Sequence, residues 1–409
     1  MEAANGCEHW TLETVKAVVE HYLLLPDGGL VVEILLAAVA ANRMNGDPFW
    51  LFLVNPPSGV KTELIRALND VEDVYPLSNL TPQTLASGFE AKKTEPSLLL
   101  RLDRHILTLK DFTTVLTMHR DKRGEILAQL REIYDGHYRK EFGNGKVVDW
   151  TGKIGLIAGV TQVIDTYHAV NQILGERFVC YRIKSEAGAA VAQRAVNNQG
   201  QEQEMRQALR GAVAGFPRTI DTKQAVRLPD PLVIKIAHLA TCCATARSAV
   251  VRDWKGEIEY IPEPEGPARL AKQLALFGEA LALVHGKQEV TEAEYIVLYR
   301  LAEDTLPRHK LTTLSALLNN PDTALRTSQI GEKTGYPTDT VRRYLQDLAA
   351  MRLVDRTAGG EGKADLWRLS AYCLMLLEQA APEEVLHHPP DTSETVQEES
   401  VSGTSGGNR

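Results

Sequence analysis

The sequence predicts an α/β protein with a mainly parallel sheet, followed by a helical region and a small C-terminal helix-turn-helix module. Short apolar segments alternate with segments of helical periodicity, which is typical of parallel β-α-β units. From residue 229 onward the periodicity is helical, and residues 325–370 indicate two helices, a turn and a hairpin. The strand candidates lie at residues 50–54, within residues 97–116, and at residues 153–161.

The composition is that of a soluble globular protein. The 409 residues are 44% hydrophobic and 24% charged, which allows a sizeable core and two or three domains. A net charge of −8 argues against a chain-wide basic surface, so any nucleic-acid contact is expected to be local. The five cysteines lack metal-ligand spacing, the first ten residues do not resemble a signal peptide, and no apolar stretch is long enough to span a bilayer. These features predict a reduced, cytoplasmic protein without a membrane partner.

Helical periodicity accounts for much of the remaining chain. Residues 10–45 predict two helices separated by the Pro-Asp-Gly-Gly segment, and residues 123–136 predict another. The Gln- and Ala-rich segment at residues 185–222 is also expected to be helical. Further on, apolar residues recur at steps of four and three on one helix face, which predicts core packing. They are Leu270, Leu274, Phe277, Leu281 and Val284.

A phosphate-binding loop is the main functional signal. Residues 55–62 follow the first apolar strand and precede a segment with helical spacing. Such a loop directs backbone N–H groups and a helix N-terminus at a phosphate, while a lysine reaches the β- and γ-phosphates and a hydroxyl binds Mg²⁺. Lys61 and Thr62 fit these two roles. The candidate nucleotide-binding residues are Asn55, Pro56, Pro57, Ser58, Gly59, Val60, Lys61 and Thr62.

Two positions of this loop depart from the general pattern, which has glycine where Asn55 and Val60 stand. Asparagine tolerates a positive φ better than most residues, whereas β-branched valine resists it. Gly59, one residue earlier, can take over part of the turn. The alternative interpretation is an ordinary turn with a solvated lysine.

The segment NPPSGVKT resembles the Walker A motif of the AAA+ ATPases, and further motifs, each individually weak, extend the resemblance over roughly residues 45–305. The resemblance implies ATP and Mg²⁺ as cofactors, with Thr62 and Asp111 at the metal. Ile106–Asp111 resembles a Walker B strand, whose final acids hold the metal and polarise water. Here the strand ends Lys-Asp rather than Asp-Glu, so Asp111 can serve the metal or the water but hardly both. Alternatively, Asp111 caps a helix through Thr113.

The resemblance implies three further catalytic residues. Thr161 matches a sensor-1 residue at the end of the third strand candidate, although an isolated threonine there is usually structural. Leu174–Phe178 resembles the arginine-finger segment of MCM-like and MoxR-like proteins, which implies that Arg177, or else Arg182, acts on a neighbouring subunit in a ring of like chains. Arg269 matches a sensor-2 arginine at the start of a lid helix. A surface salt bridge is the alternative for Arg177, and a solvent-exposed side chain is the alternative for Arg269.

Residues 325–370 predict a winged helix-turn-helix that contacts DNA. Gly335 makes the turn, and the second helix presents Arg342, Arg343 and Gln346 outward, toward phosphates and base edges. Eight basic and six acidic residues give this segment a small excess charge of +2. A winged helix used for protein contacts is the alternative. The predicted module core is Ile330, Val341, Leu345, Leu348 and Leu353, and the predicted wing is Gly359, Gly360, Gly362 and Lys363.

The predicted architecture is therefore an α/β P-loop core of AAA+ type with a parallel sheet, a helical lid and a C-terminal winged helix-turn-helix. The polar, acidic C-terminal segment is expected to be disordered. The ranges are 1–45 for an N-terminal helical lead-in, 46–222 for the nucleotide-binding core, 223–318 for the lid, 319–379 for the winged helix and 380–409 for the tail.

The function that these features predict is an ATPase that acts on DNA, such as a helicase-like or helicase-loading motor. The resemblance is to the helicase-like ATPases of phages and mobile elements, and it implies a homo-oligomeric ring. Two alternatives belong to other classes. The missing Walker B glutamate and Val60 favour an ATP-gated DNA-binding regulator with weak or no hydrolysis. A vestigial loop would leave an interaction scaffold.

Overall fold

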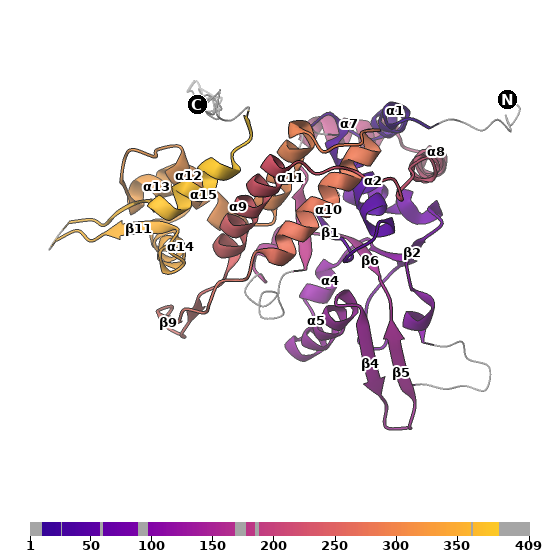
Figure 1. Cartoon of the computed structure of the whole chain (residues 1–409), viewed down its shortest axis with the longest axis horizontal. Coiled ribbons are helices and arrows are strands. Elements are labelled where there is room, and N and C mark those ends of the chain that lie inside the picture. Colours follow the sequence, from indigo (N-terminus) through magenta and orange to yellow (C-terminus); the bar gives the residue numbers. More distant parts are fainter. Residues whose placement is uncertain are drawn as a thin grey trace, which may run out of the picture.

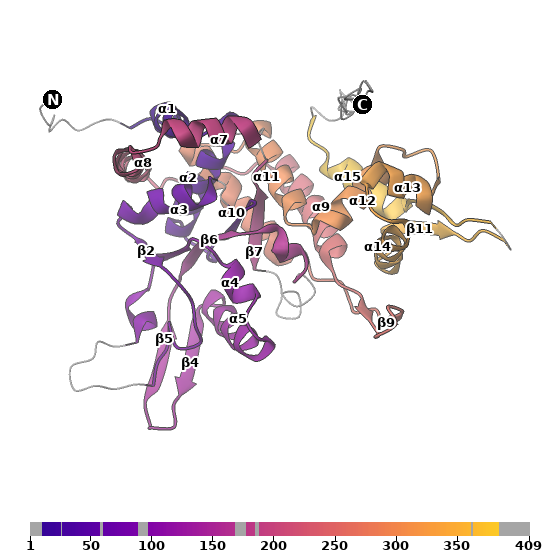
Figure 2. The same ribbon diagram turned by 180° about the vertical axis from the view of Figure 1, so that it is seen from behind.

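The computed structural model describes residues 10–25, 27–57, 60–88, 97–167, 177–184, 188–360 and 363–383. An α/β body and a helical region lie side by side, and the C-terminal module projects from the helical region (Figures 1 and 2). Ser58, Gly59, Gly362 and most of the predicted tail lie outside the described residues.

A five-stranded parallel sheet forms the centre of the body, which confirms the predicted sheet. Its order is β2-β3-β6-β1-β7, and every neighbouring pair is parallel. The central strands β3, β6 and β1 are buried along their whole length because helices or loops cover both faces. The strands are β1 (Trp50–Val54), β2 (Val74–Leu77), β3 (Ile106–Leu109), β6 (Gly155–Val160) and β7 (Phe178–Arg182).

The two faces of the sheet belong to different hydrophobic clusters. Leu51 and Leu53 of β1 pack with the helices of one face, and Trp50 and Phe52 pack with those of the other. This division follows from the alternation of side chains along a strand. The first face is covered by α2 (Leu30–Arg43), α3 (Lys61–Ala67), α8 (Glu202–Gly215) and α10 (Ala268–Val284), and the second by α4 (Thr113–Leu116) and α5 (Arg120–Tyr134).

The N-terminal helices are part of this body. The two predicted helices form as α1 (Leu12–Tyr22) and α2, with a short 3₁₀ turn at Asp27–Gly29 between them. Nearly every residue of α2 is buried, and α2 packs along α10. The described part of the segment at residues 185–222, from residue 188 onward, is largely helical, as expected, and comprises α7 (Gly188–Asn197), α8 and a 3₁₀ turn at Phe216–Arg218.

The strands differ from the sequence prediction at three places. The strand candidate within residues 97–116 narrows to β3, with a 3₁₀ turn before it and α4 after it. The edge strand β2 was not predicted because it contains Pro76, which cannot donate to a ladder and is tolerated at an edge. A hairpin of β4 (His137–Glu141) and β5 (Val147–Thr151) was also missed, and it extends away from the sheet (Figure 1).

The helical region consists of α9 (Asp230–Arg247), α10 and α11 (Glu292–Asp304). The predicted apolar stripe of α10 is buried, so its interpretation as core is confirmed. Between α9 and α10 lies an antiparallel hairpin of β8 (Val251–Arg252) and β9 (Ile258–Tyr260). Within the described residues, no helix combines the length and apolarity needed to cross a membrane.

The C-terminal module is a winged helix. Gly335 adopts a φ of 72° at the turn between its two central helices, a conformation that favours glycine. The five predicted core residues are completely buried. Its elements are α12 (Arg308–Leu318), β10 (Leu325–Arg326), α13 (Thr327–Thr334), α14 (Thr338–Ala350), β11 (Val354–Thr357) and β12 (Leu366–Leu369), and a final helix, α15 (Ala371–Ala380), packs back on α9.

Candidate functional sites

Lys61, Asp111 and Thr161 follow strands β1, β3 and β6 at the carboxyl edge of the parallel sheet. These strands are neighbours in the order β3-β6-β1, with Thr161 on the middle one. The carboxyl edge of an open parallel sheet is where ligands bind in α/β proteins. The fold therefore brings three of the sequence-predicted site residues to one edge.

The side chain of Lys61 is buried, and the residue has 4% of its surface exposed. Its Nζ donates hydrogen bonds to the carbonyl oxygens of Asn55 at 2.9 Å and Pro56 at 3.0 Å. Burial lowers the pKa of Lys61, and the nearby charge of Asp111 acts in the opposite direction. The lysine thus folds back across the loop that follows β1, and the alternative of a solvated lysine does not describe it.

Gly159 on β6 makes room for this arrangement. A Cβ atom at this position would lie 2.5 Å from the backbone oxygen of Lys110 and 3.3 Å from Cδ of Lys61. Any larger residue would therefore displace the chain after β3 or the lysine stem. Sequence reasoning did not select Gly159, although a glycine within an apolar strand signals a close backbone approach.

Val60 does not adopt the conformation that made it problematic in the sequence. Its φ of −61° and ψ of −19° are right-handed, and it directly precedes α3. The position therefore imposes no left-handed strain on a β-branched residue. Thr62 lies half-buried in the first turn of α3.

Asp111 joins the loop after β3 to the end of β6. Its Oδ1 accepts a 2.9 Å hydrogen bond from the backbone N–H of Thr113, so the helix-capping role occurs in the structure. The Thr113 hydroxyl oxygen in turn accepts from the backbone N–H of Thr161 at 3.0 Å. Phe112, which lies between Asp111 and Thr113 in the sequence, is buried against Phe52. The position after Asp111 therefore contributes to the core and supplies no acid.

Arg177 and Arg269 lie at the opposite edge of the sheet from Lys61. Phe178, which follows Arg177, pairs with Trp50 at the start of β1, whereas Lys61 follows the end of that strand. A five-residue strand is about 15 Å long. Neither arginine therefore lies at the Lys61 site of its own chain.

The guanidinium of Arg177 is held inside the chain. Its Nη2 lies 3.0 Å and 2.8 Å from the two carboxylate oxygens of Asp135, and the guanidinium lies over the ring of Tyr134. Burial lowers the pKa of Arg177, Asp135 opposes that shift, and the charge of Arg269 adds to it. Arg269 forms a 3.4 Å contact with Glu265. The two predicted arginines are thus near each other.

The outward residues of α14 are partly engaged. Arg342 and Arg343 are exposed, as is Lys363 near the wing. Gln346 is only half exposed, because its Oε1 faces the guanidinium of Arg252 at 3.3 Å. The predicted DNA-contacting residues therefore lie on one module, and two of them, Arg343 and Gln346, contact the β8–β9 hairpin.

A cleft separates the sheet edge from the winged helix. Its volume is about 1060 Å³, and Val54 at the end of β1 forms part of its wall. On the module side, the ring of His309 stacks on Tyr344 of α14 at 4.2 Å, and burial lowers the pKa of His309 to about 4. The winged helix and the end of β1 thus face a common space.

Comparison with known proteins identifies the class of the C-terminal module. The MarR family model matches residues 304–364, which span α12 to the wing. This match supports the winged helix and suggests DNA-binding regulation. No curated protein matches the chain. The protein is therefore an α/β protein with a five-stranded parallel sheet and a C-terminal winged helix of MarR type.

Proposed function

We propose that this chain is an ATP-binding protein of the AAA+ type that acts on DNA through its winged helix. One observation carries the proposal: Lys61, Asp111 and Thr161 converge at the carboxyl edge of a parallel sheet, in a chain with a MarR-type module. Among the described residues, the hydrogen bonds of this buried lysine go to two backbone carbonyls, which supports a phosphate ligand, because an anion gives a stronger, charge-assisted hydrogen bond.

The residues at this edge suit Mg·ATP. Lys61 would leave the carbonyls of Asn55 and Pro56 and bind the terminal phosphates, and backbone N–H groups of residues 58–62 would surround them. The Thr62 hydroxyl and the Asp111 carboxylate are oxygen donors of the kind Mg²⁺ prefers. Bound Mg²⁺ would neutralise charge during phosphoryl transfer. Thr161, linked to Asp111 through Thr113, would orient the attacking water.

A second candidate, a nucleotide-gated DNA-binding regulator with slow hydrolysis, is favoured by a specific feature. Asp111 already accepts the N–H of Thr113, and the next residue, Phe112, is buried in the core. One carboxylate would therefore have to serve both the metal and the water. The rate of ATP turnover separates a motor from a switch.

The positions of Arg177 and Arg269 support action between subunits. Both lie at the edge opposite Lys61, so the pair can reach a nucleotide only at the site of a neighbouring copy. A ring of like chains has this head-to-tail geometry. Arg177 would have to exchange its bond to Asp135 for the phosphoryl group.

Binding of a fluorescent ATP analogue tests the nucleotide site. The wild-type chain is expected to bind it in the presence of Mg²⁺, and Lys61→Ala is expected to lose binding or turnover. Lys223→Ala, at an exposed position, is the matched control. Undiminished binding or turnover in the Lys61 variant would refute the site.

Phosphate release with and without DNA then distinguishes the functions. DNA-stimulated release supports a motor, binding without release supports a switch, and absence of binding leaves a scaffold. Loss of DNA affinity in Arg342→Ala/Arg343→Ala tests the winged helix, with Arg368→Ala on β12 as its control.

A further inference from the structure

The β8–β9 hairpin, residues 251–260, lies against α14 and is called the lid hairpin here. It connects α9 to α10, and both views show it beside the winged helix (Figures 1 and 2). Arg252 makes the principal contact. Its Nη2 donates to Oδ1 of Asp347 at 2.6 Å and to the backbone oxygen of Arg343 at 3.0 Å.

Further hydrogen bonds hold the Arg252 side chain in this contact. Arg252 also donates through Nε to Asp347 at 3.1 Å and through Nη1 to the Gly256 oxygen at 2.6 Å, which closes the hairpin on itself. Both members of the ion pair have 17% of their side-chain surface exposed. A multiply bonded, largely buried arginine pair fixes geometry more strongly than a surface pair does.

The contact covers part of the outward face of α14, at Gln346, Asp347 and the backbone of Arg343. Val341, Leu345 and Leu348 face the module core. At 100° per residue, Arg343 and Gln346 lie on the opposite side of the helix, which in a recognition helix faces the DNA groove. Gly256 lies against the guanidinium of Arg343, since a Cβ there would be 3.3 Å from its Cζ.

The charge of the segment argues against the lid hairpin being a DNA contact itself. Residues 251–260 contain two basic and three acidic residues. A segment with this net negative charge does not attract phosphates, which dominate DNA affinity. Trp254 at its tip is 89% exposed and lies beside Lys255. An acidic element that occupies part of the recognition face therefore competes with DNA.

We propose that the lid hairpin is an autoinhibitory element: it occupies part of the outward face of α14, and DNA binding requires its release. This inference rests on the proposed DNA binding by α14. Because the lid hairpin joins α9 to α10, a rearrangement of the helical region is the motion that releases it. The conformation of the helical region would thus control whether the winged helix can bind DNA.

Fluorescence anisotropy with a labelled DNA duplex and the full-length protein tests this proposal. Arg252→Ala removes a positive charge, so without autoinhibition it would weaken DNA binding or leave it unchanged. If the variant releases the lid hairpin, DNA affinity should instead rise, by about fivefold or more. Arg227→Ala is the matched control, because Arg227 is an exposed arginine of the helical region with its own acidic partner, Glu289.

A second variant replaces residues 252–258 by a Gly-Ser linker, and it should show the same gain. Hydrogen exchange reports release directly, because the amides of the lid hairpin and of α14 should exchange faster in Arg252→Ala. Unchanged or weaker DNA binding by both variants overturns the proposal. If Arg342→Ala/Arg343→Ala binds as well as wild type, or if the wild type and both released variants all fail to bind, DNA binding by α14 itself is refuted.

Discussion

Arg182 at the end of β7 forms a two-pronged ion pair with Asp165, with Nη2 to Oδ1 at 2.7 Å and Nη1 to Oδ2 at 3.0 Å. Its Nε also donates to the backbone carbonyl of Asp304, and its backbone N–H donates to the Asp304 carboxylate. Asp165 lies in the turn that follows Thr161, and its Oδ1 accepts from the backbone N–H of Arg308 at the start of α12. One arginine thus joins the sheet, the turn after Thr161 and the winged helix.

Arg182→Ala is expected to lower the free energy of unfolding by about 3–5 kcal/mol, because it leaves the half-buried Asp165 carboxylate without its ion-pair partner and removes the guanidinium bonds to the backbone carbonyls of Asp304 and Leu306. Urea denaturation measures this change. Arg227→Ala, which breaks an exposed ion pair, should change stability by less than about 1 kcal/mol. Equal stability of the two variants would contradict a structural role for Arg182.

Asp111→Asn separates the helix cap from catalysis. The asparagine Oδ1 can still accept the N–H of Thr113, so the fold should be retained. The charge that serves Mg²⁺ or water is lost, so ATP should still bind while phosphate release falls at least about tenfold. Asp121→Asn, at an exposed position on α5, is the control. Turnover equal to wild type in Asp111→Asn would show that Asp111 only caps α4.

Val60→Gly tests whether the loop needs glycine at this position. Because Val60 is right-handed, glycine should not improve nucleotide affinity. The variant loses a half-buried side chain that packs on the core and gains backbone freedom in the unfolded chain, so stability should fall by about 1–2 kcal/mol. Thermal unfolding and ATP titration measure the two effects. A large gain in affinity would show that the valine strains the loop.

The sheet and the winged helix could be predicted because their patterns are local. Buried strands such as Trp50–Val54 are continuous apolar runs, and Gly335 marks a helix-turn-helix. The edge strand with Pro76 escaped prediction because only its place in the sheet makes proline acceptable. The β4–β5 hairpin could have been found, since Asn144-Gly145 is a strong turn signal between alternating residues.

The site was predictable in part for the same reason. Lys61, Asp111 and Thr161 follow apolar strands, and parallel strands place such residues at one edge. The space that Gly159 leaves for Lys61 depends on strand order, which the sequence pattern does not specify. The contact of Arg252 with Asp347 joins residues far apart in the chain, so no local pattern indicates it.

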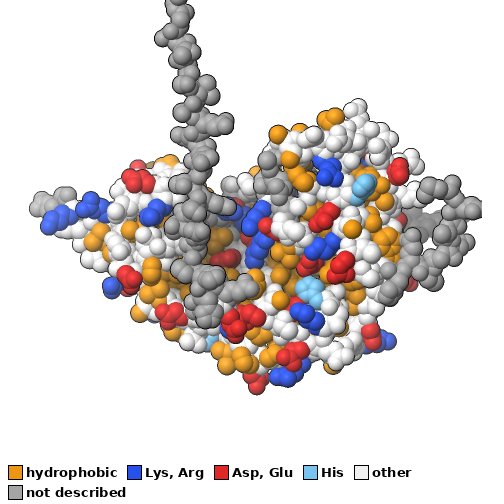
Figure 3. Space-filling view, turned by 90° about the horizontal axis from the view of Figure 1, so that it is seen from above, with side chains coloured by type: hydrophobic (Ala, Val, Ile, Leu, Met, Phe, Trp, Pro, Cys, Tyr) orange, Lys and Arg blue, Asp and Glu red, His pale blue; other side chains and the backbone are white. Residues whose placement is uncertain are grey.

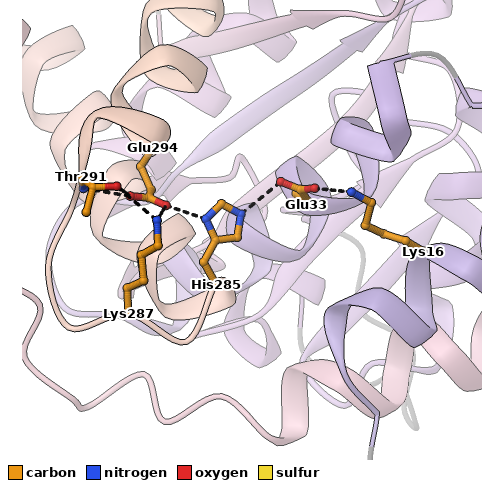
Figure 4. Close-up of polar contacts among 6 residues, drawn as sticks. All are labelled: Lys16, Glu33, His285, Lys287, Thr291 and Glu294. Carbon is orange, nitrogen blue, oxygen red and sulfur yellow. Dashed lines mark hydrogen bonds and ion pairs between the residues drawn. The ribbon is translucent and has the colours of Figure 1, made fainter. Parts of the chain in front are cut away.

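His285 should make stability fall at alkaline pH. It bridges Glu294 through Nδ1 at 2.6 Å and Glu33 through Nε2 at 3.1 Å; Lys287 donates to the same oxygen of Glu294, and Lys16 donates to the other oxygen of Glu33 (Figure 4). Burial opposes protonation, but the two carboxylates outweigh it and raise the pKa of His285 from 6.5 to about 9. The pKa values of Glu33 and Glu294 are lowered, so both stay ionised in this range.

A raised pKa stabilises the folded state fully below the unfolded value near 6.5, and this stabilisation is lost as the pH rises through 9. The loss should be on the order of 2 kcal/mol between pH 6.5 and 9.5. Denaturation at several pH values measures it. His285→Gln should be less stable at neutral pH and should lack most of this alkaline slope; a slope equal to that of wild type would exclude His285 as its source.

Surface charge is consistent with DNA contact through a local region. On the face shown in Figure 3, basic and acidic side chains are interspersed. We therefore expect Arg342 and Arg343, on the outward face of α14, to make the phosphate contacts that salt weakens. DNA affinity should fall as salt rises, and Arg342→Ala/Arg343→Ala should reduce the slope by about one to two units on a logarithmic plot. An unchanged slope in that variant would place the phosphate contacts elsewhere.

Mixing two inactive variants tests whether ATP sites are shared between subunits. Lys61→Ala removes one half of a shared site, and Arg177→Ala removes the other half, which lies at the opposite edge of the sheet. Asp135 is half exposed, so water can solvate it after Arg177 is removed and the fold should persist. Random mixing in equal amounts gives about one quarter of the interfaces two intact halves. ATP turnover should therefore reappear in the mixture, whereas a mixture that stays inactive while still oligomeric would mean that Arg177 has only its structural bond to Asp135.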